Sequence, residues 1–198
     1  MEFSLSSEQE MLIESARAFA ENELYPHEEE VEQSDSVSPE LAQKIRDRAI
    51  EMGFYAANMP EDLGGGGLDC VSLSLVEREL GRANFALQYL VGRPSNILQA
   101  CVGEQRDHYL FPCIRGEKTD CLAMTEPGAG SDLRSMQCRA DIDGDDYVIN
   151  GTKHFISHAD IADFVILFAA TGEEESARGP RKLISAFLVD KGTPGFSV

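Results

Sequence analysis

Residues 123–132 read Ala-Met-Thr-Glu-Pro-Gly-Ala-Gly-Ser-Asp, and this stretch decides how the rest of the chain is interpreted. The small residues at positions 128–130 let backbone N–H groups approach an anion closely and permit a positive φ angle. The hydroxyl groups of Thr125 and Ser131 can each donate and accept hydrogen bonds. A strand that ends in such a loop can hold a flat heteroaromatic ring at one end and phosphates at the other, so the stretch predicts a cofactor-binding loop.

The stretch does not match the two common phosphate-binding motifs. A Walker loop needs a lysine that leads into a helix, and residues 123–132 contain no lysine. A Rossmann fingerprint needs a helix after its glycines. Apolar and polar residues instead alternate from Met136 to Ile142, which is a strand pattern. The sequence therefore predicts a strand–loop–strand site in a β domain.

A second segment, Tyr147–Ser157, supports the same interpretation. Its centre is Asn150-Gly151, a pair that favours the tight type I′ turn of a hairpin. We therefore expect two short strands joined at this turn.

Both segments resemble the flavin-contacting segments of acyl-CoA dehydrogenases, and the resemblance covers essentially the whole chain. The family places an aromatic, an aliphatic and a hydroxyl residue against the flavin ring, and these positions are Phe155, Ile156 and Ser157 here. The family usually has tryptophan and threonine at the outer two positions. This chain contains no tryptophan, so a smaller stacking surface is expected.

The resemblance implies FAD as the cofactor. Leu122 stands where the family often has an aromatic residue, so looser packing on the flavin is expected there. Ser157 would hydrogen-bond the flavin edge near N5, and Ser131 would also lie near the CoA arm of a substrate. The complete set of implied cofactor-binding residues is Leu122, Met124, Thr125, Gly130, Ser131, Phe155, Ile156 and Ser157.

Two further residues are predicted to contact the substrate. Arg93 falls where the family's helical domain approaches the acyl-chain cavity, and its guanidinium could pair with a carboxylate or sulfinate at the far end of a short acyl group. The alternative is a surface arginine at a helix start that Ser95 caps. Thr171, at the end of a predicted strand, is expected near the CoA nucleotide.

The family oxidises an acyl-CoA thioester to the trans-2-enoyl thioester. A carboxylate removes the proton next to the carbonyl, flavin N5 accepts a hydride, and hydrogen-bond donors hold the thioester oxygen. The electrons pass to an electron-transfer flavoprotein, and family members are commonly homotetramers. The resemblance thus implies an acyl-CoA substrate, that protein partner, and a homo-oligomer when the protein is complete.

The catalytic base of the family is a glutamate in, or just before, a third, carboxy-terminal helical domain. The chain ends at Val198 within the predicted β domain, and none of its acids matches that base. Glu126 is interpreted as a residue that fixes the loop, since a general base must reach the substrate carbon. We therefore expect a fragment without a catalytic residue, with weak FAD affinity and no turnover alone.

Two alternatives stay open from the sequence. A non-catalytic flavin- or CoA-binding or assembly module would keep the scaffold without the chemistry, although it need not keep a flavin pocket. A flavin-dependent relative, such as an acyl-CoA oxidase, a desulfinase or a monooxygenase, would differ in oxygen access and in the absent domain.

The first part of the chain has helical patterns. Ser7-Glu8-Gln9-Glu10 has the spacing of a capping box, and Ser38-Pro39-Glu40 predicts a second helix with proline at its first position. Residues 60–67 are expected to form a loop whose four glycines are a flexible connector.

From Asp120 onward the patterns are strand-like, with residues 172–182 as a polar loop between two strands. The predicted fold is α+β, because a block of helices is followed by a block of strands. An all-α amino-terminal domain, residues 1–118, precedes an antiparallel β-barrel-like middle domain, residues 119–198.

The composition excludes several classes of function. A net charge of −18 on 198 residues argues against a nucleic-acid partner, whose phosphates would be repelled. Much of this charge lies between Glu21 and Asp35, which we interpret as a solvated helix end and loop. No apolar run approaches the length of a membrane span, and a helix start near the amino terminus leaves no room for a targeting peptide. A cytoplasmic protein is expected.

The five cysteines show no paired spacing, so a zinc site is not expected. Scattered thiols in an odd number indicate a reducing compartment and buried, inert side chains. His154 and His158 lie four residues apart in or beside a predicted strand, where they would not share a face, so they do not predict a metal site.

Overall fold

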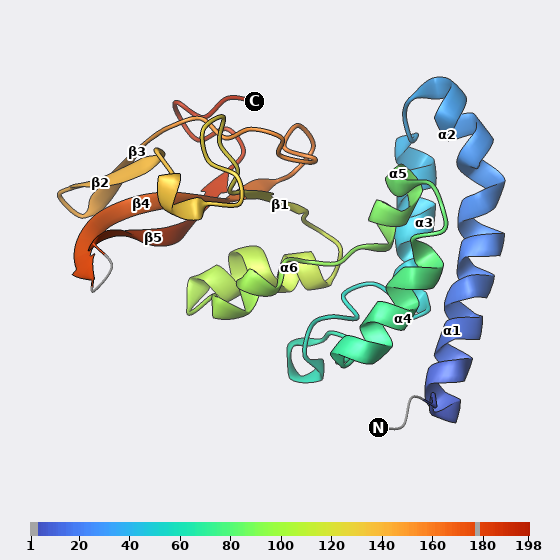
Figure 1. The fold of residues 1–198 in the computed structure, drawn as a ribbon. Helices are drawn as coiled ribbons and strands as arrows, with labels where there is room; N and C mark the ends of the chain where they lie inside the picture. Colours follow the sequence, from blue (N-terminus) through green and yellow to red (C-terminus); the bar gives the residue numbers. More distant parts are fainter. Residues whose placement is uncertain (1–3, 177–178) are drawn as a thin grey trace. The chain divides into compact units, whose positions relative to one another are not determined.

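The computed structural model describes residues 4–176 and 179–198. The chain divides into two compact units, Met1–Glu117 and Lys118–Val198. The first unit is helical and the second is built on a sheet (Figure 1). The helices of the first unit are α1 Ser7–Phe19, α2 Glu28–Ser34, α3 Pro39–Glu51, α4 Cys70–Leu80, α5 Phe85–Gln88 and α6 Phe111–Ile114.

The first helix begins one residue earlier than the sequence predicts. The Ser6 hydroxyl accepts the N–H of Gln9, and the Gln9 side chain bonds back to the N–H of Ser6, which together make a capping box. The prediction of Ser7 was wrong because both neighbouring serines have a suitable partner three residues later. The prediction for α3 is confirmed: the Ser38 hydroxyl accepts the N–H of Leu41, and Pro39 occupies the first position.

The acidic stretch is not only a solvated helix end. Pro26 has no N–H to continue an α-helix, and the chain passes from α1 to α2 through a π-helical turn and a 3-10 turn. The Glu28 carboxylate then accepts the backbone N–H of Asn84 at 2.6 Å, and Glu32 accepts the Asn84 side-chain amide. Two of the acids therefore hold the start of α5.

The four glycines at 64–67 form a packed loop, so the prediction of a flexible connector was wrong. A Cβ atom added at Gly65 would lie 2.2 Å from the Met59 carbonyl oxygen, and one at Gly66 would lie 2.9 Å from Cα of Ala57. The N–H of Gly66 donates to the carbonyl of Ala56 at 3.1 Å. Close approach between two backbone segments, rather than freedom of movement, requires these glycines.

The second unit contains one mixed sheet, so the prediction of an antiparallel barrel was wrong. Strand β4 pairs in parallel with β1 and with β2, and antiparallel with β5, while β2 and β3 are antiparallel. Parallel pairing joins strands distant in sequence and cannot be read from local alternation. The strands are β1 Asp120–Ala123, β2 Arg139–Asp143, β3 Asp146–Asn150, β4 Phe164–Ser176 and β5 Gly179–Asp190.

The hairpin turn does not lie at Asn150-Gly151. Strands β2 and β3 are joined at Asp143–Asp146, where Gly144 has a φ of +64°. After β3 the chain is irregular through residue 163, so the second predicted strand does not form. Gly151 is needed for packing instead, because a Cβ there would lie 2.6 Å from Cβ and Sγ of Cys138.

Residues 172–182 are not a loop in the part that the structure describes. Strand β4 continues to Ser176 and β5 starts at Gly179. The register between these strands shifts between Ala170 and Gly172, which leaves Thr171 as the extra residue of a bulge. Bulges commonly lie next to binding sites, where they redirect a side chain.

All five cysteines are free, and four of them are buried as predicted, whereas Cys70 at the start of α4 is exposed. Burial raises the pKa of the Cys121 thiol to about 11, so this thiol is inert near neutral pH. Within residues 4–176 and 179–198, no helix is both long and apolar enough to cross a membrane.

Candidate functional site

The predicted cofactor loop leaves β1 at Ala123 and folds into a tight turn. The N–H of Glu126 donates to the carbonyl of Ala129 at 2.9 Å, and the N–H of Ala129 donates back to Glu126 at 3.2 Å. The side chain of Ala129 is buried beneath this turn. The turn thus has a fixed backbone shape before any ligand binds.

The Glu126 carboxylate is buried at the centre of the site and accepts three hydrogen bonds. Its donors are the backbone N–H groups of Gln137 at 2.6 Å and Cys138 at 2.9 Å, and the ammonium group of Lys153 at 2.9 Å. Burial acts to raise the pKa of Glu126, but these donors outweigh it and hold the pKa below its usual range. The prediction that Glu126 fixes the loop is confirmed.

Lys153 joins the loop to the second predicted segment. Its Nζ atom also donates to the carbonyl of Met124 at 3.1 Å, and the neighbouring N–H of His154 donates to the carbonyl of Thr125 at 2.8 Å. The two segments that the sequence assigns to one cofactor are therefore hydrogen-bonded to each other, although residues 151–162 are not a strand. Sequence reasoning missed Lys153, because an isolated lysine in a predicted strand gives no signal of burial.

The far side of the turn is open to a ligand. Within the described residues, the N–H groups of Gly128, Gly130 and Ser131 have no hydrogen-bond acceptor, and a Cβ added at either glycine would meet nothing within 4 Å. Neither glycine has a positive φ, so the turn does not use the conformational freedom that the small residues permit. Three unused N–H groups beside open space match what the phosphates or ring edge of a dinucleotide require, so the residues present fit FAD.

Phe155 projects from the second segment into solvent. Its side chain is 83% exposed, and its φ of +58° is unusual for an aromatic residue. Ile156 packs against the buried cluster around Ala123 and Val165, while Ser157 is exposed. Leu122, on β1, is also partly exposed. A cavity of about 450 Å³ is lined by residues 151–156, among others.

Thr171 lies at the bulge in β4, where its hydroxyl is 3.1 Å from the hydroxyl of Ser185 and donates to the Leu183 carbonyl at 3.4 Å. These contacts are to β5 rather than to the cofactor loop. The structure therefore brings together Met124, Thr125 and the 153–156 segment, but gives no contact between them and Thr171.

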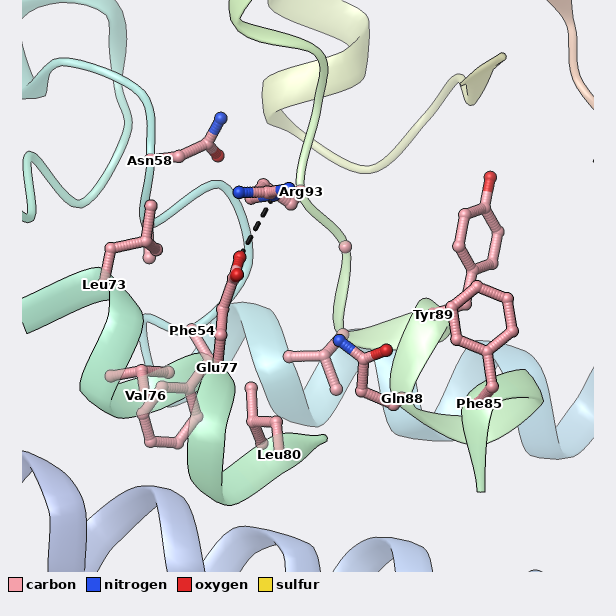
Figure 2. A pocket seen from close by; sticks show the side chains of 13 residues that line it. Phe54, Asn58, Leu73, Val76, Glu77, Leu80, Phe85, Gln88, Tyr89 and Arg93 are labelled. Atoms are coloured by element: carbon pink, nitrogen blue, oxygen red, sulfur yellow. Dashed lines mark ion pairs between the residues drawn. The ribbon is translucent and has the colours of Figure 1, made fainter. Parts of the chain in front are cut away.

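Arg93 lines a separate cavity of about 350 Å³ within the helical unit. Its Nε atom lies 3.1 Å from a carboxylate oxygen of Glu77 on α4, and Figure 2 shows the two side chains meeting across the cavity. The cavity also contains apolar and aromatic side chains, among them Val76 and Tyr89. Ser95 does not cap the turn that follows it, so the alternative of a capped helix start was wrong in that detail.

Asn58 is a further polar residue of this cavity that sequence reasoning missed. Its amide nitrogen donates to the carbonyl of Pro94 at 2.8 Å and to the side chain of Asn96 at 2.7 Å, which holds the backbone that follows Arg93. Its amide oxygen is buried and has no hydrogen-bond partner in the described part of the chain. A bound group with a donor would satisfy it.

Comparisons with known proteins match one family model to each of the two units. The family model for the acyl-CoA dehydrogenase N-terminal domain matches residues 6–117, and the model for the acyl-CoA dehydrogenase middle domain matches residues 121–198.

Individual relatives span both units. The short-chain-specific acyl-CoA dehydrogenase of Clostridium acetobutylicum is 32% identical over 203 positions, which cover 100% of this chain and 52% of that protein. Subunit CarC of the caffeyl-CoA reductase–Etf complex of Acetobacterium woodii is 36% identical over 98% of this chain and 50% of that protein. The structure of a glutaryl-CoA dehydrogenase of Mycobacterium smegmatis, solved with FADH2, superposes with a TM-score of 0.80 at 27% identity. The match covers 98% of this chain and 48% of that protein. The chain thus spans about half the length of these relatives.

Proposed function

The chain belongs to the acyl-CoA dehydrogenase family, and on this premise we propose that it forms the helical amino-terminal domain, residues 1–118, and the flavin-binding middle domain, residues 119–198, of an FAD-dependent acyl-CoA dehydrogenase. The proposed reaction is oxidation of an acyl-CoA thioester to the enoyl-CoA, for which bound FAD would supply the hydride acceptor. The observation that carries the proposal is the hydrogen-bonded joint between the loop at 124–126 and the segment at 153–154.

The unused N–H groups of the turn are proposed to receive the cofactor's polar edge or phosphates, with Thr125 and Ser131 adding hydroxyl groups. Ser131 would also face the CoA arm, and Thr171 the CoA nucleotide. Apolar and aromatic side chains would cover the flavin ring, with Ser157 at its edge. These ring-facing side chains are Leu122, Met124, Phe155 and Ile156.

The catalytic base is proposed to come from outside the two matched domains. Glu126 lies within the proposed cofactor loop, but its carboxylate is already used by three donors and its lowered pKa makes it a weak base. Its position supports a structural role and leaves the proton transfer to another residue.

The Arg93 cavity is proposed to receive the end of the acyl group. Because Glu77 already pairs with Arg93, a terminal carboxylate would have to displace Glu77, whereas an uncharged acyl end could pack on the apolar wall and leave the pair intact. The name of the caffeyl-CoA reductase–Etf relative supports an electron-transfer flavoprotein as the proposed redox partner, with the reaction run in either direction. A cytoplasmic homo-oligomer completes the proposal.

The direct test titrates the purified 198-residue chain with FAD and then adds acyl-CoAs anaerobically, with saturated, branched and terminally carboxylated acyl groups. We expect a bound-flavin spectrum and no bleaching, because the base is outside these residues. Bleaching would contradict the assignment of the base, and its acyl preference would show whether Arg93 binds a carboxylate. Absence of any flavin binding would contradict the cofactor proposal and favour a non-catalytic module.

A pair of glycine substitutions separates cofactor binding from folding. Gly130→Ala adds a methyl group to open space, so the free energy of unfolding should change by less than about 0.5 kcal/mol. The same methyl would stand beside the N–H groups offered to the cofactor, and FAD affinity should fall at least tenfold. Gly151→Ala is the matched control, since its methyl meets Cys138 and should destabilise by about 2 kcal/mol or more. Urea denaturation and FAD titration measure both quantities; unchanged affinity in Gly130→Ala would contradict the assignment.

A further inference from the structure

His154 and Phe155 form an exposed stack of two rings beside the proposed flavin site. Their ring centroids are 3.7 Å apart and their planes are inclined by 18°, which is a parallel arrangement. Consecutive residues of an extended chain point to opposite sides. The stack therefore depends on the positive φ of Phe155, which brings the second ring back over the first.

The backbone on both sides of Phe155 is held in place. The N–H of His154 donates to the carbonyl of Thr125 at 2.8 Å, and Lys153 is fixed by its buried ion pair. After Phe155, the Ile156 side chain packs into the buried cluster that includes Ala123. A positive φ is unfavourable for an aromatic residue, and these contacts on either side hold Phe155 in that conformation.

Among the described residues, the ring that contacts the exposed ring of Phe155 is the imidazole of His154. An exposed side chain pays rotational entropy when a ligand immobilises it, and prior ordering removes that cost. The two rings lie face to face, so contact with the imidazole restricts the rotation of the phenyl ring. The imidazole therefore orders the phenyl ring before a ligand arrives and covers one of its faces, which leaves the other face for the ligand.

We propose that His154 is a positioning residue for the flavin ring, acting through Phe155: the imidazole covers one face of the phenyl ring and leaves the other face as the stacking surface in a chain that has no tryptophan. This inference rests on the proposed function, because it takes FAD as the ligand. His154 does not carry protons or touch the reacting atoms in this role; it sets the orientation of the ring that the flavin would meet.

The test compares FAD affinity among variants of the full chain by fluorescence titration, with urea denaturation of each apo variant. His154→Ala should weaken FAD binding about fivefold without changing the unfolding midpoint, and His154→Phe should restore binding to within twofold. In a Phe155→Leu background, His154→Ala should have no further effect, because its partner is gone. His108→Ala is the matched control, since that imidazole contacts Tyr109 edge-on in the helical unit, at 4.5 Å and 85°.

Each outcome is decisive. Unchanged affinity in His154→Ala, failure of His154→Phe to rescue, or an equal loss in the Phe155→Leu background would overturn the inference and leave the proposed function standing. A lower unfolding midpoint in His154→Ala would overturn it in favour of a purely structural role. No FAD binding by the unaltered chain would overturn the proposed function and the inference together.

Discussion

Replacing Lys153 with methionine is expected to lower the free energy of unfolding of the second unit by about 3 kcal/mol. The Lys153 and Glu126 side chains are only 7% and 3% exposed, so water does not screen the pair. Methionine keeps the length of the side chain but leaves a buried carboxylate without its counter-ion. It also removes the donor to the Met124 carbonyl, so the loop would lose one of its links to the 153–154 segment.

The measurement is urea denaturation followed by circular dichroism, with Arg139→Met as the matched control. Arg139 pairs with Asp141 at 2.7 Å, but both side chains are more than half exposed, so the control should cost less than about 1 kcal/mol. Equal losses in the two variants would contradict the assignment of a buried, structural ion pair.

A double variant separates the loss of a partner from the loss of the pair. Glu126→Gln alone removes the counter-ion of the buried Lys153 ammonium. It also replaces one carboxylate oxygen with an NH2 group, which cannot accept from the N–H groups of Gln137 or Cys138. Adding Lys153→Met removes that unpaired charge. The double variant should therefore lose less unfolding free energy than the two single variants lose in sum. The difference should be about 1 kcal/mol or more, as expected for groups in direct contact.

The helical part of the fold was predictable where local chemistry decides it. Ser38 and Pro39 mark the start of α3 because a hydroxyl cap and a proline at the first position suit a helix end and little else. The sheet was predictable only as a set of strands. The parallel pairing of β1 with β4 depends on residues more than forty positions apart, such as Asp120 and Phe164, and no local pattern encodes it.

The predictions made from glycines were wrong at two places, because a glycine can serve either a turn or the close approach of two segments. Asn150-Gly151 and Asp143-Gly144 both have the composition of a hairpin turn, and the turn forms at the second pair. Gly151 is instead required by the Cys138 side chain, and Gly65 by the Met59 carbonyl. A glycine required for close backbone approach and a glycine required for a turn look the same in a sequence, and the structure distinguishes them.

The motifs point to the loop and to the second segment, but they do not reveal how the two are joined. The loop and the second segment were both identified, yet the residue that joins them, Lys153, carries no motif of its own. Its role follows from the burial of Glu126, a charged residue that stands beside an exposed proline. Burial of a single carboxylate is decided by tertiary packing, which residue spacing alone does not reveal.

The largest effect expected in the helical unit comes from Glu79, a carboxylate on α4 that is 3% exposed. Its oxygens accept hydrogen bonds from Arg17 on α1 at 3.0 Å, Arg78 at 2.8 Å and Arg82 at 3.2 Å. Glu79→Gln should lower the free energy of unfolding by about 2 kcal/mol. This loss is smaller than that expected from breaking a fully buried ion pair, because the three arginines are about half exposed. Glu51→Gln, at an exposed pair with Arg48, is the matched control and should cost less than about 1 kcal/mol.

The same carboxylate should make stability depend on acid pH in a defined direction. The hydrogen bond from Arg17, with those from Arg78 and Arg82 and against the effect of burial, lowers the pKa of Glu79 from 4.5 to about 2. The unfolded chain therefore binds the proton first as the pH falls, so the stabilisation from Glu79 is complete above pH 4.5 and is lost progressively toward pH 2. The gap in unfolding free energy between the parent chain and Glu79→Gln, measured by urea denaturation from neutral pH to pH 3, should narrow through this window. A constant gap would mean that Glu79 titrates alike in the folded and unfolded chain, and the three arginines would then not act on it as the geometry indicates.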